Sequence, residues 1–128
     1  MKTASPYLMF DGSCKEAIKH YAQCFKTEAK IIPSEKDENR VMHASVQKGS
    51  FLIMASDWDS KDYRLGNNSQ IYIDCESRQE VDELFTSLGE GGQDQMKPDN
   101  TFWGSYFGSV TDKYGVCWMM GYDEPKTK

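Results

Sequence analysis

The sequence predicts an α+β fold made of two β-α-β-β-β modules, which form a curved mixed sheet with the helices on its outer face. The main observation is a repeat of signals at a spacing of 64 residues, which is half of the 128-residue chain. Residues 13–16 (SCKE) correspond to residues 77–80 (SRQE), and each set follows a short apolar run and begins an amphipathic helical pattern. Such a repeat predicts two copies of one supersecondary unit. We expect residues 1–122 to form a single domain, followed by a polar tail at residues 123–128.

The first module is predicted to span about residues 1–56. A strand at residues 7–10 precedes a helix that begins at Ser13, where the Ser13 hydroxyl and the Glu16 carboxylate are expected to form a capping box. Apolar side chains at helical spacing give this helix one buried stripe. Three strands are expected next, at residues 29–32, 41–47 and 51–56, the last two joined by a turn at residues 48–50.

A polar linker at residues 57–68 leads into the second module, which is predicted over about residues 69–122. Its helix begins at Ser77, where Glu80 completes a second capping box, and the helical pattern ends at Gly89. The strands of this module are expected at residues 69–75, irregularly within residues 91–100, and at residues 105–111 and 116–122. The linker is rich in turn-forming residues, which favours a connection between modules over a further strand.

The composition predicts a globular protein of the cytoplasm. Hydrophobic residues make up 38% of the chain and charged residues 27%, which is typical of a folded domain. The formal net charge is −5, and the pattern contains no basic face, so nucleic acid is not expected as a partner. The apolar runs are too short to span a bilayer, and nothing before the first strand is typical of an export signal.

The four cysteines are expected to be reduced thiols. None of them belongs to a C-x-x-C pair, and a small chain without an export signal gives little reason to expect a disulfide framework. A reactive thiolate needs a nearby positive charge or the start of a helix, and the sequence shows neither beside Cys117.

Strand alternation predicts which side chains line the inner, concave face of the sheet, because residues two apart point to the same side. His43 and Ser45 are expected inward, with Met42, Ala44 and Val46 directed toward the helices. The repeat then places Phe107 and Ser109 inward in the second module. The other positions expected on the inner face are Tyr7, Met9, Val41, Ile53, Ala55, Ile71, Ile73, Cys117 and Met119, and Trp118 and Met120 are expected toward the helices.

Four short strings resemble a known family. The modules resemble those of the vicinal oxygen chelate superfamily, which includes glyoxalases, fosfomycin resistance enzymes, extradiol dioxygenases and bleomycin-binding proteins. The strings that resemble its PhnB-like branch are residues 6–12 (PYLMFDG), 41–44 (VMHA), 102–104 (FWG) and 111–118 (TDKYGVCW). Members of that branch often carry a demethylubiquinone methyltransferase label, which fold analogy alone does not justify. The resemblance implies a glyoxalase-like fold and a homodimer.

The resemblance also implies where a metal would bind. Catalytic members of the superfamily hold a divalent metal with His, Glu or Gln from the first and last strands of each module. By position, those places fall near Ser5, Ala55, Ser69 and Met119, and Met119 stands where the superfamily commonly has Glu. None of these side chains is a credible ligand for a hard or borderline cation. We therefore expect that the usual metal site is missing and that no cofactor is bound.

His43 is the candidate polar group of the inner face. Burial favours the neutral imidazole, which can exchange one hydrogen bond with a ligand. The alternative is a histidine that is bonded to a backbone group or to a hydroxyl such as that of Ser45. The other histidine, His20, is expected on the surface of the first helix.

An aromatic cluster is expected in the second module. Its members are Phe102, Trp103, Tyr106 and Phe107. These rings could close over a flat apolar ligand. Ordinary packing or a seam between two copies of the chain is the alternative.

Together with the resemblance, these residues predict a PhnB-like protein that lacks the usual metal site and binds a small, partly apolar molecule on its concave face. The predicted ligand-binding residues are His43, Phe107, Trp103, Tyr7, Met119 and Ala55. One alternative is a metal-dependent or His-assisted enzyme of the same superfamily, of the lyase, transferase or dioxygenase type. The other alternative is a non-catalytic dimeric interaction module.

Overall fold

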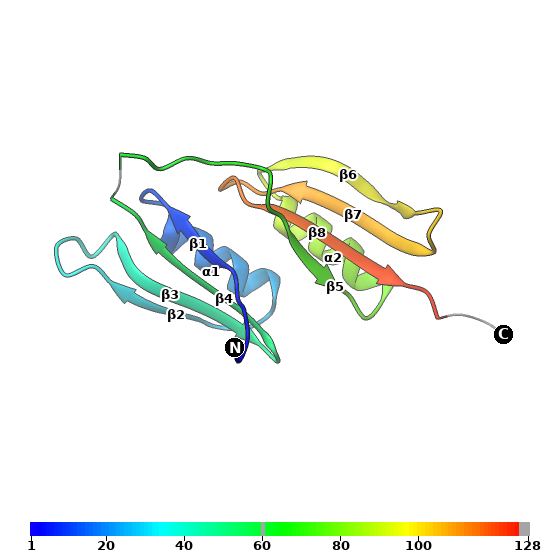
Figure 1. Cartoon of the computed structure of the whole chain (residues 1–128), viewed down its shortest axis with the longest axis horizontal. Coiled ribbons are helices and arrows are strands. Elements are labelled where there is room, and N and C mark those ends of the chain that lie inside the picture. Colours follow the sequence, from blue (N-terminus) through cyan, green and yellow to red (C-terminus); the bar gives the residue numbers. More distant parts are fainter. Residues whose placement is uncertain (60, 126–128) are drawn as a thin grey trace. The chain divides into compact units, whose positions relative to one another are not determined.

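The computed structural model describes residues 1–59 and 61–125 and divides the chain into two compact units, Met1–Arg64 and Leu65–Lys128. Within the described residues, each unit contains one helix and one four-stranded sheet, in the order strand, helix and three strands (Figure 1). The predicted α+β fold of two β-α-β-β-β modules is therefore confirmed. The end of the predicted polar tail, residues 126–128, lies outside the described residues. Neither helix of the described part of the chain is long and apolar enough to cross a bilayer.

In the first unit, the elements are β1 (Tyr7–Phe10), α1 (Cys14–Cys24), β2 (Ala29–Pro33), β3 (Val41–Lys48) and β4 (Phe51–Asp57). The strand order of the sheet is β1-β4-β3-β2, in which β1 runs parallel to β4 and the other neighbours are antiparallel. Lys48 is paired with Phe51, so only Gly49 and Ser50 form the hairpin turn. Gly49 has a φ of 59°, a left-handed conformation that glycine adopts without steric cost.

The second unit repeats this topology with β5 (Ile71–Asp74), α2 (Arg78–Gly89), β6 (Gln93–Asn100), β7 (Ser105–Thr111) and β8 (Cys117–Asp123). Its strand order is β5-β8-β7-β6, and β5 runs parallel to β8. The strand expected to be short and irregular, β6, extends over 8 residues. It lies at the edge of the sheet with two register shifts, and it contains Pro98. An edge strand tolerates a proline and can lack the alternation of apolar and polar residues that marks most strands. The sequence therefore gives only a weak signal for β6.

In the first unit, α1 packs against one face of the sheet; the face that a unit's own helix leaves uncovered is called its open face (Figure 1). Ala44 and Val46 are fully buried on the α1 side, as predicted. Ala55 and Ile53 are their direct antiparallel partners and are also 0% exposed. Because direct cross-strand partners point to the same side, the expectation that Ile53 and Ala55 line the inner face is wrong. Val41, expected inward, is buried, and Met42, expected toward the helices, is 55% exposed, so both expectations are wrong. The register shift at Ile32 and Pro33 leaves Met42 without a paired residue in β2 and interrupts the regular alternation at this end of β3.

The same correction applies to the second unit. Trp118 and Met120 are fully buried on the side of α2, as predicted. Ile71 and Ile73 of β5 are paired with these two residues, so they share the covered face and the expectation that they point inward is wrong. Tyr72, which lies between them in β5, is directed to the open face instead.

The Ser77 half of the predicted capping box of α2 is present, whereas the Glu80 carboxylate binds the residue before the cap instead of the cap residue itself. The Ser77 hydroxyl accepts a hydrogen bond from the backbone N–H of Glu80 at 3.1 Å. In return, the Glu80 carboxylate accepts one from the backbone N–H of Glu76 at 2.9 Å. One donor that the helix start leaves unpaired, the N–H of Glu80, is thereby satisfied, and the chain just before the cap is held to the first turn.

The predicted capping box of α1 is wrong, because the side chain of Ser13 makes no capping hydrogen bond. A carboxylate from the end of β4 takes its place. Asp57 Oδ1 accepts from the backbone N–H groups of Gly12 at 2.7 Å and Cys14 at 3.1 Å, and Oδ2 accepts from that of Val41 at 2.9 Å. Asp57 therefore ties the start of α1 to the beginning of β3 and the end of β4.

A second carboxylate organises the turn between β7 and β8. Asp112 is 3% exposed, and its Oδ1 accepts from the backbone N–H groups of Tyr114 at 2.8 Å and Val116 at 3.0 Å. Its Oδ2 accepts from the indole Nε1 of Trp118 at 2.7 Å. This network orients the largest side chain of the second core.

Candidate functional site

Tyr7 and His43 form a polar pair on the open face of the first sheet. The Tyr7 hydroxyl lies 3.4 Å from Nδ1 of His43, and the ring centroids are 5.9 Å apart. Tyr7 is 46% exposed and His43 is half-buried. Tyr7 is paired with Met54, which in turn is paired with Ser45, so the three strands β1, β4 and β3 bring these side chains together. The sequence prediction that Tyr7 and His43 share a face is confirmed.

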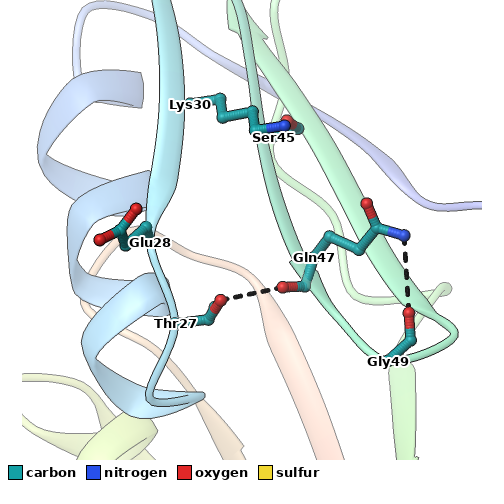
Figure 2. Close-up of a pocket in the computed structure, with 6 residues that line it drawn as sticks. All are labelled: Thr27, Glu28, Lys30, Ser45, Gln47 and Gly49. Carbon is teal, nitrogen blue, oxygen red and sulfur yellow. Dashed lines mark hydrogen bonds between the residues drawn. The ribbon is translucent and has the colours of Figure 1, made fainter.

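A groove continues this open face toward the hairpin end of β3. Its volume is about 450 Å³. Its lining residues, shown in Figure 2, are Thr27, Glu28, Lys30, Ser45, Gln47 and Gly49. Alternation along β3 puts Ser45 and Gln47 on the same side as His43. Lys30 of β2 is the direct partner of Ser45. Sequence reasoning named Ser45 but missed Lys30, which the antiparallel pairing of β2 with β3 would have identified.

The open face of the second sheet carries aromatic side chains. Phe107 stacks on Tyr72 with ring centroids 6.5 Å apart and an interplanar angle of 18°. Trp103 meets Phe107 edge-on at 6.2 Å and also contacts Phe102 at 5.0 Å. Trp103 is 57% exposed and Tyr72 is 49% exposed, so these rings present apolar area to the surroundings. Met119 lies beside them, because it is paired with both Tyr72 and Ser109.

Tyr72 was missed by sequence reasoning, and its position depends on a glycine. A Cβ at Gly121 would lie 2.6 Å from the Tyr72 hydroxyl, so a larger residue there would displace the ring from its present position. Burial, followed by the charges of Asp74 and Asp123, raises the pKa of Tyr72 above its ordinary value. The phenol is therefore neutral at physiological pH and can donate a hydrogen bond.

Two of the expected residues are placed elsewhere. Tyr106 belongs to the α2 side: its hydroxyl donates to Asp82 at 2.6 Å, and the guanidinium of Arg78 lies 4.0 Å from its ring centroid. Ala55 is in the core beneath α1 and is paired with Ala44. A side chain on the covered face does not line the open face, so the geometry does not support Ala55 as a ligand contact.

The cysteines are free and buried, as the sequence predicted for reduced thiols. Burial, with a smaller effect from the Asp57 charge, raises the pKa of the Cys14 thiol to about 12. Burial and the neighbouring Glu80 raise the pKa of Cys75 to about 12 as well. Both groups are protonated thiols near neutral pH, and a thiol in that state is a poor nucleophile.

The positions that correspond to the superfamily's metal ligands do not fit a metal. Ala55 offers only a buried methyl group and Met119 a thioether, whereas Zn²⁺ needs His, Cys or carboxylate and hard cations need several oxygens. Ser5 and Ser69 add only neutral hydroxyls. Across residues 1–59 and 61–125, no group of three or more His, Cys, Asp or Glu side chains is arranged to hold a metal ion.

Comparison with known proteins identifies the relatives of this chain. The sequence profile of the family described as 3-demethylubiquinone-9 3-methyltransferase matches residues 2–120. Protein YjdN of Escherichia coli (strain K12) is 30% identical, over 91% of this chain and 92% of that protein.

Solved structures similar to this chain include proteins with related descriptions. Protein PA1353 from Pseudomonas aeruginosa has a TM-score of 0.83 and 32% identity, covering 98% of this chain and all of that one. The putative 3-demethylubiquinone-9 3-methyltransferase, PhnB protein, from Bacillus cereus has a TM-score of 0.80 and 25% identity, covering 94% of this chain and 99% of that one. A glyoxalase/bleomycin resistance protein/dioxygenase family enzyme from Burkholderia phytofirmans, 15% identical with a TM-score of 0.68, shares the fold. The chain therefore belongs to the family described as 3-demethylubiquinone-9 3-methyltransferase, and it is similar to a PhnB protein of that description.

Proposed function

We propose that this protein binds a small, partly apolar molecule on the open faces of its sheets. The observation that carries the proposal is the Tyr7–His43 pair, two partly exposed polar side chains only 3.4 Å apart. A phenol and an imidazole beside apolar side chains can exchange hydrogen bonds with one polar group of a ligand. Ligand sites typically combine apolar walls with a few such polar groups.

The proposed apolar contacts of the ligand are side chains that are partly exposed to solvent in the structure. Met9 and Ile32 flank the Tyr7–His43 pair on the first sheet and are 36% and 49% exposed. The open face of the second sheet, by itself, has Phe107, Trp103 and Met119 as its proposed contacts, and the exposed ring of Tyr72 lies on the same face and supports them. Burying aromatic surface of this kind is favourable for a flat ring.

The family description supports this class of ligand. It names a demethylated ubiquinone, which is a flat ring with polar oxygens and an apolar chain. Methyl transfer is a second candidate function, for which His43 is the group that could accept the proton of a phenol-type acceptor. The Tyr7 hydroxyl lies 3.4 Å from Nδ1 of this imidazole, which places a second polar group beside the bound acceptor.

The test is a titration of the ¹⁵N-labelled protein with 2-naphthol, a flat apolar probe with one hydroxyl. The expected result is saturable shifts at Tyr7 and His43 and at Phe107, and an affinity that falls about tenfold in His43→Ala, as one lost hydrogen bond in an apolar site would cause. His20→Ala is the matched control, because it removes the chain's other imidazole from α1 on the covered face.

Replacing Phe107 with Trp is expected to change the affinity while the spectrum of the free protein keeps the dispersion of a folded chain. Equal affinities of the wild type, His43→Ala and His20→Ala would refute the role of His43. Shifts confined to α1 and α2 would refute binding on the open faces.

We also propose that the protein forms a homodimer and is located in the cytoplasm. Phe102, 98% exposed beside the half-exposed Trp103, supports a seam between two copies, since a ring so exposed is a typical site of association. Light scattering on the purified protein tests this: a mass twice that of one 14.6 kDa chain is expected, and a monomer in wild type would contradict it.

A further inference from the structure

The groove beside β3 holds polar groups that the fold does not use. Among the residues that the structure describes, Lys30 forms no ion pair and the hydroxyl of Ser45 forms no hydrogen bond. Thr27 is different, because its hydroxyl donates to the backbone carbonyl of Gln47 at 3.0 Å. The Gln47 side-chain amide donates weakly to the carbonyl of Gly49 at 3.5 Å. The unused groups of the groove are therefore the Lys30 ammonium and the Ser45 hydroxyl, which are hydrogen-bond donors, and the Glu28 carboxylate, which is an acceptor.

The two donors of the groove, Lys30 and Ser45, lie next to each other. Lys30 and Ser45 are direct partners across β2 and β3, and Figure 2 shows the Lys30 side chain extending toward Ser45. The carboxylate of Glu28, the acidic residue of the lining, is turned to the opposite side in the same view. An anion in the groove would thus meet two donors without facing that carboxylate directly.

The groove and the Tyr7–His43 pair belong to one surface of one sheet. His43, Ser45 and Gln47 alternate along β3 and so point to the same side. Residues two apart on a strand are separated by about 7 Å. A molecule with a ring against Tyr7 and His43 would therefore carry a group about 7 Å away to Ser45 and Lys30.

We propose that this groove binds the carboxylate of the ligand, so that the protein recognises arylalkyl carboxylic acids, with Lys30 and Ser45 holding the carboxylate and His43 and Tyr7 contacting the ring. This inference rests on the proposed function and specifies its ligand class. Charge-assisted hydrogen bonds are stronger than neutral ones, so the acid binds more tightly than an uncharged ligand of the same shape.

The experiment compares 4-phenylbutyrate with its amide, 4-phenylbutyramide, by calorimetry and by titration of the ¹⁵N-labelled protein. The acid is expected to bind about tenfold more tightly than the amide, which is the ratio that one charge-assisted hydrogen bond supplies. Lys30→Gln removes this preference and Ser45→Ala reduces it, because each change weakens binding of the acid more than binding of the amide. The preference also falls as the salt concentration rises, because Lys30 is exposed.

Lys19→Gln is the matched control, since it removes one exposed ammonium from α1, which covers the other face of the sheet. An acid preference that Lys30→Gln leaves unchanged, or that Lys19→Gln removes, overturns the inference. If acid and amide bind equally and His43→Ala weakens both, the carboxylate site is refuted and the proposed function stands. If neither compound shifts any open-face resonance, both proposals are refuted for this ligand class.

Discussion

The Tyr7 hydroxyl lies 3.4 Å from Nδ1 of His43, on the face of the first sheet that α1 leaves uncovered. This distance is longer than that of a strong O–H···N bond, so the pair retains hydrogen-bonding capacity for a third partner. The proposed function depends on that capacity.

The substitution Tyr7→Phe removes the hydroxyl of Tyr7 and keeps its ring, so it tests the two contributions to binding separately. We expect the affinity for 2-naphthol to fall by about twofold to fivefold, less than in His43→Ala, because the ring contact is retained and only one weak hydrogen bond is lost. The dissociation constants of the two variants, measured by the same titration, check the order. A larger loss in Tyr7→Phe than in His43→Ala would make Tyr7, and not His43, the principal polar contact.

Ser13 and Ser77 occupy equivalent places in the two units, yet only Ser77 caps its helix. Ser77→Ala is expected to lower the free energy of unfolding by about 1 kcal/mol, as the loss of a capping hydroxyl does. Ser13→Ala should change it by less than about 0.5 kcal/mol, because Asp57 satisfies the start of α1. Urea denaturation measures both, and equal losses would contradict the difference between the two helix starts.

Asp112→Ala leaves two backbone N–H groups and the indole of Trp118 without their acceptor. The expected loss in the free energy of unfolding is about 2–4 kcal/mol, because buried donors lose their partners. Asp112→Asn keeps one acceptor oxygen and should therefore lower the free energy of unfolding by less than Asp112→Ala. Asp94→Ala, an exposed carboxylate on β6, is the control and should stay within about 0.5 kcal/mol of the wild type.

The buried thiols predict a loss of stability at alkaline pH. The pKa of Cys14 and of Cys75 is about 12 in the folded protein, against 9.0 for an ordinary thiol. Unfolding makes both groups easier to deprotonate, so their contribution to stability is fully present below about pH 9 and is lost as the pH rises to about 12. Urea denaturation from about pH 8 to about pH 11 measures this decline. The decline should be smaller in the Cys14→Ala/Cys75→Ala double variant, and an unchanged slope would contradict the assignment.

Metal content tests the interpretation of Ser5, Ala55, Ser69 and Met119. Because these side chains do not suit Zn²⁺, Ni²⁺, Mn²⁺ or Fe²⁺, the purified protein should contain none of them in stoichiometric amount. Addition of each metal should leave the melting temperature unchanged. A stoichiometric metal that is lost in Met119→Leu would contradict this interpretation.

Local patterns predicted most of the fold. The helical stripes and the apolar runs placed α1, α2 and seven of the strands close to their observed bounds, because each pattern involves residues that are near in sequence. The exception, β6, is a polar edge strand that contains Pro98. The prediction of the capping group of α1 was wrong for another reason. The group that caps this helix, Asp57, is more than forty residues away in sequence.

Alternation within a strand predicted the side of some site residues correctly and of others wrongly. His43 and Ser45 were placed on the correct face, but Ile53 and Ala55 were not, because their side depends on the register of β3 against β4. Pairing across a two-residue turn at Gly49 and Ser50 would have fixed that register. Tyr72 depends on the register of β5 against β8, two strands that are distant in sequence and for which the chain contains no short-range signal. Lys30 depends on the register of β2 against the next strand, β3, which alternation within one strand does not give.

The most direct test of ligand binding on the open face is the set of nuclear Overhauser effects between bound 2-naphthol and the ¹³C-labelled protein. The proposed function predicts contacts from the probe's aromatic protons to the imidazole of His43 and to the ring of Tyr7. Contacts that appear only to side chains of α1 or α2, with none to His43 or Tyr7, would contradict it.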